Sequence, residues 1–386
     1  MRVKLKDAFN LQMGKTPSRA DLSLWGGNNK WISIADIGSA KKHISSTKEC
    51  ITDEGVSRSG IKVVPEGTVI MSFKLSIGKT AIVSEDMYTN EAIMAFIDNG
   101  TYCIDPNYLY HLCCGTDWTQ GGNKAVMGLT LNKATLSEME IELPTLEEQR
   151  EIASILDQLD AIIEKRHDEL NMIEQLVKSR FIELFGDFPK QRLGDYCSTH
   201  ARIGWQKLTR AEFLETGDYY LVTGWDFDVK NRVVDFSKCY YVSKERYEQD
   251  KKLMLKVGDV LLTKDGTLGK VAIINEMDKP ATLNGHIFVI RPLDERLSPH
   301  FLVGCFASND FKYQMEQNKT GSTIVGVTQK ALLEFQIPIA PIDLQMEFKR
   351  FMQQTDKSKF FACQTLSFLL KLANNLQSWR EKQYDY

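Results

Sequence analysis

The sequence predicts an α+β chain in which two mixed α/β domains are separated by two long helices that form an antiparallel coiled coil, arranged as a pseudo-twofold internal repeat. Three observations predict this architecture. The length of 386 residues fits two to three compact units. The chain resembles itself at a spacing of about 190 residues, which indicates a duplicated plan. Two stretches, 145–187 and 341–386, carry the heptad pattern of long paired helices.

The composition places the chain among globular proteins. With 43% hydrophobic and 26% charged residues, 10 Pro and 25 Gly, it is neither collagen-like nor disordered. No segment approaches 18 apolar residues, and Met1–Asp7 lacks the apolar core of a signal peptide, so we expect a cytoplasmic protein with no membrane partner. The 8 cysteines never form a CxxC pair, which predicts reduced thiols rather than a disulfide framework or a zinc site. A net charge of −3 argues against a polycation that coats nucleic acid indiscriminately.

The two domains are predicted over residues 1–144 and 188–340, because matching residues recur in both. At an offset of 191 the matches predict a strand, a glycine turn and a returning strand. The offset is 188 near the start of each half and 196 near its end, as small loop insertions would produce. The dipeptides Asp105-Pro106 and Ser298-Pro299 each place an N-cap residue before a proline, which predicts a helix start in both halves.

The spacer helices are predicted over 145–187 and 341–386. The first has a seam that steps alternately by four and three residues, which is the heptad of a coiled coil. Its members are Leu156, Leu159, Ile163, Arg166, Leu170, Ile173, Val177 and Arg180. The second seam is weaker and includes Leu366, Leu369 and Leu376, and the repeat offset sets Arg166 opposite Ala362 and Arg180 opposite Leu376.

Charge supports pairing of these two helices. Residues 145–187 hold 5 basic and 11 acidic side chains, whereas 341–386 hold 7 and 5, so the net charges of −6 and +2 are complementary. Helices of about 40 residues, at ~1.5 Å per residue, are up to ~60 Å long. In the alternative interpretation, each helix packs only on its own domain.

Motifs for catalysis are missing from the sequence. The segments Gly14–Thr16 and Gly78–Thr80 look like the tail of a phosphate-binding loop, but Phe9 and Phe73 stand where its first glycine belongs. Asp105–Tyr108 resembles the motif of amino-methyltransferases but lacks the second proline and an upstream glycine-rich cofactor loop. The 6 histidines have no metal-ligand spacing. We therefore predict no catalytic, cofactor-binding or metal site, and a protein that is not itself an enzyme.

Polar and basic loops recur in both halves and suit contacts with base edges and phosphates. Each loop alone is equally consistent with an ordinary turn, but recurrence at matching positions favours binding. In the first half, residues 1–79 hold 13 basic and 7 acidic side chains against 2 and 9 for 80–144, which favours one cationic face. The candidate DNA-binding residues are Ser18, Arg19, Asn28, Lys30, Ser72, Lys74, Asn123 and Lys124 in the first half, and Arg202, Trp205, Lys207, Lys264, Thr267, Asn284, His286, Lys319, Ser322 and Thr323 in the second.

The motifs resemble a known family, the DNA specificity subunits of type I restriction-modification systems, over essentially the whole chain. Thr16-Pro17-Ser18, followed by Trp25–Asn28 and Trp31–Ile37, is similar to the opening of a target-recognition domain in that family. Leu143–Ile152 is similar to the motif that begins its spacer helix. The second copy, Ile339–Gln345, departs from the pattern because its proline is shifted.

The resemblance implies a function. Each domain would be a target-recognition domain for one half of a split site in double-stranded DNA, and the coiled coil would set the spacing. Family members do no chemistry themselves. They hold two methyltransferase subunits that use S-adenosylmethionine for adenine methylation, and the complex recruits ATP-dependent restriction subunits. S-adenosylmethionine, ATP and magnesium are thus expected on partner subunits, with none in this chain. Two alternatives remain: a coiled-coil scaffold with peptide-binding domains, and the recognition part of a fused restriction enzyme.

Overall fold

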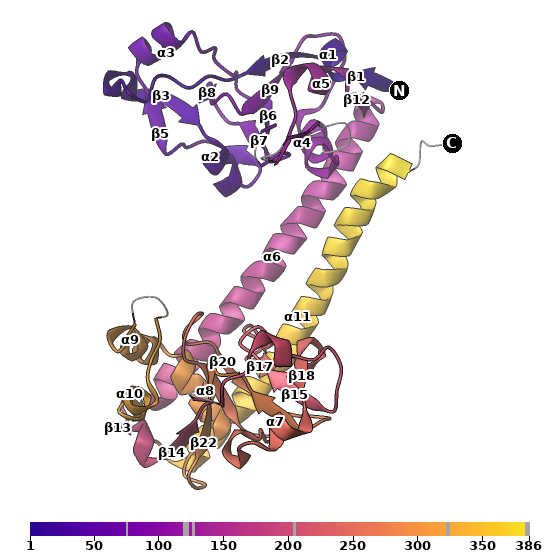
Figure 1. Ribbon diagram of the computed structural model, residues 1–386. Helices are drawn as coiled ribbons and strands as arrows, with labels where there is room; N and C mark the ends of the chain where they lie inside the picture. Colours follow the sequence, from indigo (N-terminus) through magenta and orange to yellow (C-terminus); the bar gives the residue numbers. More distant parts are fainter. Residues whose placement is uncertain (75, 119–122, 126–127, 204–205, 322–324, 383–386) are drawn as a thin grey trace. The chain divides into compact units, whose positions relative to one another are not determined.

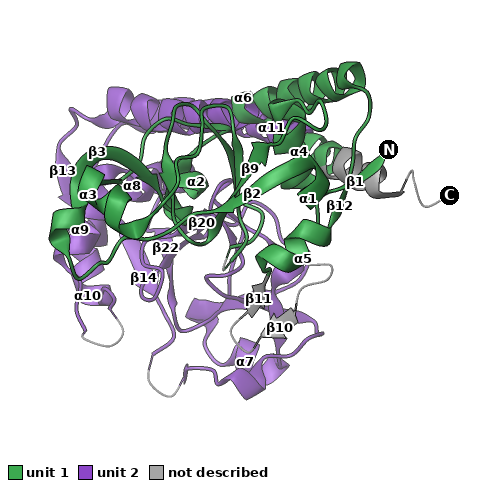
Figure 2. Cartoon of the chain, turned by 90° about the horizontal axis from the view of Figure 1, so that it is seen from above, with its two compact units in different colours: residues 1–165, 366–386 green, residues 166–365 purple. Residues whose placement is uncertain are grey.

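The computed structural model describes residues 1–74, 76–118, 123–125, 128–203, 206–321 and 325–382, of which 123–125, 128–130 and 374–382 are described by their backbone alone. The chain divides into two compact units, shown in separate colours in Figure 2. Unit 1 comprises Met1–Lys165 with Leu366–Tyr386, and unit 2 comprises Arg166–Thr365. The division passes through both long helices, so each unit holds one α/β domain and part of each helix.

Unit 1 is built around a five-stranded sheet in the order β2-β9-β6-β7-β4 and a three-stranded sheet in the order β5-β3-β8. The strands of these sheets are β2 (Phe9–Met13), β3 (Trp25–Ile32), β4 (His43–Ile44), β5 (Glu49–Ile51), β6 (Val69–Ser72), β7 (Thr80–Val83), β8 (Tyr88–Thr89) and β9 (Ile93–Asp98). Two pairs complete the strands: β1 (Arg2–Lys4) with β12 (Glu140–Glu142), and β10 (Asn123–Ala125) with β11 (Gly128–Thr130). The helices are α1 (Leu5–Ala8), η1 (Leu22–Leu24), α2 (Ile34–Ser39), α3 (Asp53–Ser59), α4 (Pro106–Gly115), α5 (Lys133–Glu138) and the start of α6 (Leu146–Phe185).

Unit 2 repeats this plan. Its larger sheet has the order β14-β22-β19-β20-β17-β16 and its smaller sheet the order β18-β15-β21. The strands are β13 (Lys190–Arg192), β14 (Cys197–His200), β15 (Tyr219–Val222), β16 (Phe227–Asp228), β17 (Val233–Val234), β18 (Tyr240–Val242), β19 (Val260–Thr263), β20 (Val271–Ile273), β21 (Ala281–Leu283), β22 (Ile287–Pro292) and β23 (Gln336–Pro338). The helices are η2 (Leu193–Asp195), η4 (Arg210–Glu212), η5 (Phe236–Lys238), α7 (Lys244–Glu248), η6 (Lys251–Leu253), α8 (Pro299–Ala307), α9 (Asn309–Gln317), α10 (Gln329–Leu333) and α11 (Ile342–Lys382).

The two copies agree in register as well as in order. Val69 pairs with Ile82 across β6 and β7, and Val260 pairs with Ile273 across β19 and β20, at the offset of 191 seen in the sequence. In both units the smaller sheet has one antiparallel and one parallel neighbour beside its central strand. The predicted duplication of two mixed α/β domains is confirmed.

Successive side chains of the central strands β6 and β19 point to opposite faces of the sheet, which divides each core into two layers. In β6, Val69 and Met71 pack with α4 on one face of the sheet, while Ile70 joins a separate cluster on the other face. In β19, Val260 and Leu262 pack with α8, while Leu261 joins the second cluster. A period of two sends successive side chains to opposite faces, so both faces of these strands are buried. Figure 1 shows α4 and α8 beside the larger sheets of their units.

A buried glutamine joins each long helix to its domain. Gln149 near the start of α6 accepts a hydrogen bond from the backbone N of Asp105 at 2.9 Å and donates to the carbonyls of Cys103 and Pro144. Gln345 near the start of α11 accepts from the backbone N of Ser298 at 2.8 Å and donates to two carbonyls in the same manner. Asp105 and Ser298 are the predicted N-caps of α4 and α8. The same contact therefore fixes the start of both spacer helices.

Within unit 2 the helices α6 and α11 run antiparallel (Figure 1). Glu174 contacts Lys359 and Arg180 contacts Glu347, so the numbering rises on α6 as it falls on α11. The described seam residues are buried or half-buried: Leu156, Leu159, Ile163, Arg166, Leu170, Ile173, Val177, Arg180, Leu366 and Leu369. The side chain of Leu376 lies outside the described residues. The antiparallel pairing of long helices is confirmed.

The predicted register of Arg180 was wrong. The guanidinium Nη2 lies 2.5 Å from Oε1 of Glu347, far along the helix from Leu376. The repeat offset compares equivalent positions of two copies, whereas an antiparallel pair brings together positions that run in opposite directions. Among the described residues, no helix is both long and apolar enough to cross a membrane.

Candidate nucleic-acid interface

Three predicted loop segments of unit 2 lie together where β19 ends and β22 begins. The backbone N of Lys264 donates to the carbonyl of His286 at 3.0 Å, and Nδ1 of His286 lies 2.5 Å from Oδ1 of Asp265. The carbonyl of Lys264 accepts from the backbone N of Val327 at 2.9 Å, and Gly326 pairs with Thr320. Tertiary structure thus gathers segments around residues 264–267, 284–286, 319–321 and 325–327 into one loop cluster.

A fourth predicted segment, which contains Arg202 and Lys207, is bound to this cluster through the side chain of Arg202. Its Nε donates to the carbonyl of Leu283 at 2.7 Å. Its Nη1 and Nη2 donate to backbone and side-chain oxygens of Gln206, Gln249, Arg246 and Thr282. The side chain is 0% exposed, and burial lowers its pKa to about 10. Arg202 therefore holds its loop against β21, and its side chain has no exposed surface for a direct contact with DNA.

Two lysines of the cluster lie near enough to each other to interact electrostatically. Lys207 is exposed, and a Cβ on Gly285 would lie 3.5 Å from its Cγ, so its stem runs beside the 284–286 segment. Lys264 is half-buried, with its Nζ 5.7 Å from the ring centroid of Phe288. Burial and, more weakly, the positive charge of Lys207 lower the pKa of Lys264, while Asp265 opposes the shift. Neighbouring cations that repel one another are suited to a polyanion, which supplies the compensating charge.

The hairpin tip has the same geometry in both units. The hydroxyl of Thr263 donates to the carbonyl of Thr267 at 2.5 Å and accepts from the backbone N of Lys270 at 2.9 Å. Ser72 repeats these contacts with Ser76 and Lys79. Ser72 is 0% exposed, so its role is to close the turn.

Two other hairpin residues can face a ligand. Thr267 is exposed at the tip of the second hairpin. Lys74 is half-buried at the tip of the first, with its Nζ 5.2 Å from the ring centroid of Phe73.

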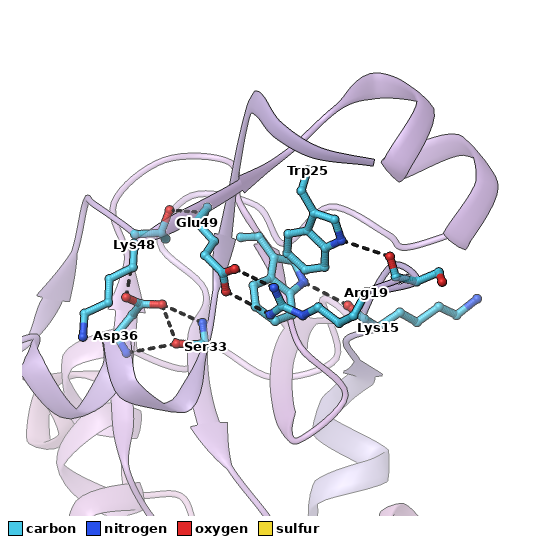
Figure 3. A network of polar contacts seen from close by, with 10 residues as sticks. Lys15, Arg19, Trp25, Ser33, Asp36, Lys48 and Glu49 are labelled. Carbon is cyan, nitrogen blue, oxygen red and sulfur yellow. Dashed lines mark hydrogen bonds and ion pairs between the residues drawn. The ribbon is translucent and has the colours of Figure 1, made fainter. Parts of the chain in front are cut away.

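In unit 1 the predicted segment around Arg19 is held by two tryptophans (Figure 3). The guanidinium carbon of Arg19 lies 3.7 Å from the ring centroid of Trp25, and its nitrogens contact Glu49 at 2.5 and 2.9 Å. The hydrogen bond from Arg19 lowers the pKa of Glu49. Trp25 donates to the carbonyl of Ser18, and Trp31 to the carbonyl of Lys15. This loop has a fixed shape, and Arg19 already has an anionic partner.

The remaining predicted residues differ in whether their side chains are exposed or already paired with a carboxylate. Asn28 is exposed on β3, whereas Lys30 is paired with Glu85 and Lys319 with Glu316. The side chains of Asn123 and Lys124, and the residues Trp205, Ser322 and Thr323, lie outside the described residues.

Two residues of the clusters were missed from the sequence. Asn90 is the counterpart of Asn284, because its backbone N donates to the carbonyl of Ile32 at 3.0 Å while that of Asn284 donates to Val222 at 2.9 Å. The internal repeat carried the signal for Asn90. The second missed residue is Trp225, which is 88% exposed in the loop after β15. Its exposure could not be read from the sequence, since most tryptophans are largely buried.

Within the described part of the chain, no group of three His, Cys, Asp or Glu side chains is placed to hold a metal ion. What both units present instead is a set of turns that carry amide, hydroxyl and basic side chains at one end of the sheets. Such side chains suit contacts with phosphates and base edges.

The sequence profile of the type I restriction modification DNA specificity domain matches residues 1–175 and 187–362. The MjaVIII specificity subunit of Methanocaldococcus jannaschii is 23% identical over 379 residues, covering 92% of this chain and 85% of that protein. The MjaIX specificity subunit of the same organism is 29% identical over 189 residues, 48% of this chain and 43% of that protein. A chain from a structural study of the assembly of the type I R-M system shares the fold with a TM-score of 0.64 at 17% identity, covering 98% of this chain and 96% of that one. The chain therefore belongs to the family of type I restriction-modification DNA specificity subunits.

Proposed function

We propose that each of the two domains binds one half of a bipartite site in double-stranded DNA, and that the paired helices set the spacing between the halves. One observation carries this proposal. The same loop cluster recurs in both units on one backbone plan, with Asn90 and Asn284 at equivalent positions, but the residues beside them differ, as in Glu91 against Gly285. Two domains that share one backbone fold but carry different surface side chains are suited to recognise two different base sequences.

Specific contacts are proposed for the exposed and half-buried groups of the clusters. Phosphate contacts fall to Lys207 and Lys264 in the second domain and Lys74 in the first, because each is basic and lies at a loop tip. Contacts with base edges fall to Asn284 and His286, and to Asn28 and Asn90 in the first domain.

The spacing follows from helix length. Helices of about 40 residues are ~60 Å long at ~1.5 Å per residue, which exceeds one duplex turn of ~34 to 36 Å. The two half-sites should therefore be separated by base pairs that the protein does not read.

The chain is a non-catalytic component of its system, so modification must be supplied by partners. Two domains of one plan offer two equivalent docking surfaces, which suits two copies of one methyltransferase subunit. These subunits would carry S-adenosylmethionine and methylate adenine. Restriction subunits would join through them and bring ATP and magnesium, in the cytoplasm where the DNA lies.

The test is methylome sequencing of a host that expresses the adjacent candidate methyltransferase with and without this chain. We expect a split, adenine-methylated motif that disappears when the chain is deleted. Exchange of residues 1–144 for those of a relative should change one half of the motif and leave the other unchanged. A continuous motif would contradict the bipartite site, and no dependence of methylation on the chain despite a stable complex would favour the peptide-binding scaffold.

A further inference from the structure

The same turn follows the central strand of the smaller sheet in both units. After β3, Oδ2 of Asp36 accepts a hydrogen bond from the backbone N of Ser33 at 2.8 Å. After β15, Oδ2 of Asp226 accepts from the backbone N of Thr223 at 2.6 Å. Both aspartates are buried, with exposed fractions of 5% and 3%. Each closes a four-residue turn next to the loop cluster of its unit, and in unit 1 this turn is also the capped start of α2.

The two turns differ at their third position, where unit 1 has Ala35 and unit 2 has Trp225. Because the turn forms with a methyl group at this position, its geometry does not require an aromatic ring. Trp225 is 88% exposed, more than any other large hydrophobic side chain in the described residues. An indole that packs so little against its own domain contributes little to folding.

The loop that carries Trp225 is held in place. The backbone N of Trp225 donates to the hydroxyl of Thr223 at 3.3 Å, and Nζ of Lys270 donates to the carbonyl of Gly224 at 3.4 Å. The same Nζ lies 5.7 Å from the ring centroid of Trp225. A Cβ on Gly224 would lie 3.1 Å from Cγ2 of Thr263, so the loop fits closely against the hairpin. The ring is therefore presented to solvent from a rigid support.

Single exposed hydrophobic residues are common on protein surfaces and need no explanation by themselves. Trp225 differs because of its neighbours. Val222, at the end of the strand before it, accepts the hydrogen bond of Asn284, and Lys270 follows the hairpin tip that carries Lys264. The ring thus lies beside the cluster proposed to face DNA.

We propose that Trp225 packs its indole ring against a nucleobase of the half-site that the second domain reads. Ala35, at the equivalent position of the first domain, has no ring to make this contact. This inference rests on the proposed function. Reaching a base face in a duplex requires local unstacking, which costs least at flexible pyrimidine–purine steps. Trp225 would then select such a step without any hydrogen bond to it.

The experiment uses the full chain assembled with its methyltransferase subunits and the duplex motif that the methylome defines. Equilibrium binding is compared for the wild type, Trp225→Ala, Trp225→Phe and the control Leu293→Ala. Leu293 is 58% exposed and follows the far end of β22, away from the cluster. Loss of an aromatic–base contact weakens binding by about tenfold or more. We expect that loss for Trp225→Ala, a smaller loss for Trp225→Phe and no change for Leu293→Ala.

Two further readouts identify the base contact. The salt dependence of binding should be the same for Trp225→Ala and the wild type, because the indole carries no charge. A single mismatch placed along the second half-site already weakens base stacking at one step, so less free energy is needed to unstack that step when the protein binds. At the contacted step it should strengthen binding by the wild type and not by Trp225→Ala.

The outcomes separate this inference from the proposed function. If the wild type prefers its motif over unrelated duplex and Trp225→Ala binds equally well, the inference fails while the proposed function stands. If Trp225→Ala weakens assembly with the methyltransferase but leaves DNA affinity unchanged, the ring is a protein contact and the inference also fails. If the wild type shows no sequence preference, the proposed function itself fails.

Discussion

Nζ of Lys359 on α11 lies 3.2 Å from Oε2 of Glu174 on α6, and the lysine side chain is only 2% exposed. The same carboxylate pairs with Arg232, a buried residue of the domain whose φ of 55° is in the left-handed region. Its neighbouring cations hold the pKa of Glu174 below its usual value against the opposing effect of burial. One carboxylate thus joins two helices and a domain loop.

Replacing Glu174 with Gln should destabilise unit 2, because it leaves Lys359 and Arg232 buried without their anionic partner. Removing one member of a fully buried ion pair costs about 3–5 kcal/mol, and partial exposure of Glu174 reduces this to roughly 2–3 kcal/mol. Urea unfolding monitored by circular dichroism measures the change. The matched control is Glu183→Gln, since Glu183 is 67% exposed although it pairs with Arg180. Equal midpoints for both variants would show that the buried pair is dispensable.

Replacing Lys359 with Met should cost much less than Glu174→Gln. The substitution keeps the apolar stem in the helix seam, and Glu174 keeps Arg232 as its partner. Exchange of a buried charge for an apolar group of similar volume is often close to neutral, within about 1 kcal/mol. The same urea titration measures the free energy of unfolding of Lys359→Met for comparison with that of Glu174→Gln. A loss as large as that of Glu174→Gln would mean that the lysine, rather than the carboxylate, holds the contact together.

Removing the amide of Gln345 should loosen the start of α11. The side chain is 0% exposed, and truncation to Ala leaves the backbone N of Ser298 and two carbonyls without partners. Each unsatisfied buried group costs about 1–3 kcal/mol, so we expect a loss of roughly 2–4 kcal/mol after local relaxation. Gln354→Ala, at an exposed position of the same helix, is the control. Comparable thermal stability of the two variants would argue against the anchor.

His300 on α8 should make stability depend on pH. Burial and, secondly, the charge of Lys349 lower its pKa to about 4 in the folded chain, whereas an unfolded histidine titrates near pH 6.5. Between these values the unfolded chain binds more protons, so the free energy of unfolding should fall as the pH drops from about 6.5 toward 4. His300→Gln should flatten this part of the profile, and the exposed His43 gives the control variant His43→Gln. An unchanged slope in His300→Gln would exclude this residue as the source.

Lys207→Ala and Lys264→Ala should weaken DNA binding without unfolding the domain. If each contacts one phosphate, each variant should lower the slope of log affinity against log salt by about 1 and do so on any sequence. Fluorescence anisotropy at several salt concentrations measures the slope, and circular dichroism checks the fold. Lys230→Ala, on the 228–232 loop outside the cluster, should leave the slope unchanged. Unchanged slopes for both cluster variants would remove these loops from the interface.

The sequence by itself determined the duplicated plan, the strand-turn-strand hairpin of each half and the existence of two long helices. These features are encoded locally and periodically. Glycine turns, N-cap residues followed by proline, and a seam at every three to four residues each specify an element from its own neighbours. Their recurrence at a second place in the chain predicted the duplicated architecture, and the structure pairs Val69 with Ile82 and Val260 with Ile273 at the same offset.

Only the tertiary structure decided which polar groups face outward. Arg202 and Ser72 looked like loop residues open to a ligand, but both are buried and hold turns together. Trp225 carried no signal in the sequence and is exposed, while Arg180 meets Glu347 across an antiparallel seam. Exposure and partner choice depend on which distant segments pack over a residue, and a pattern confined to one stretch of chain carries no information about them.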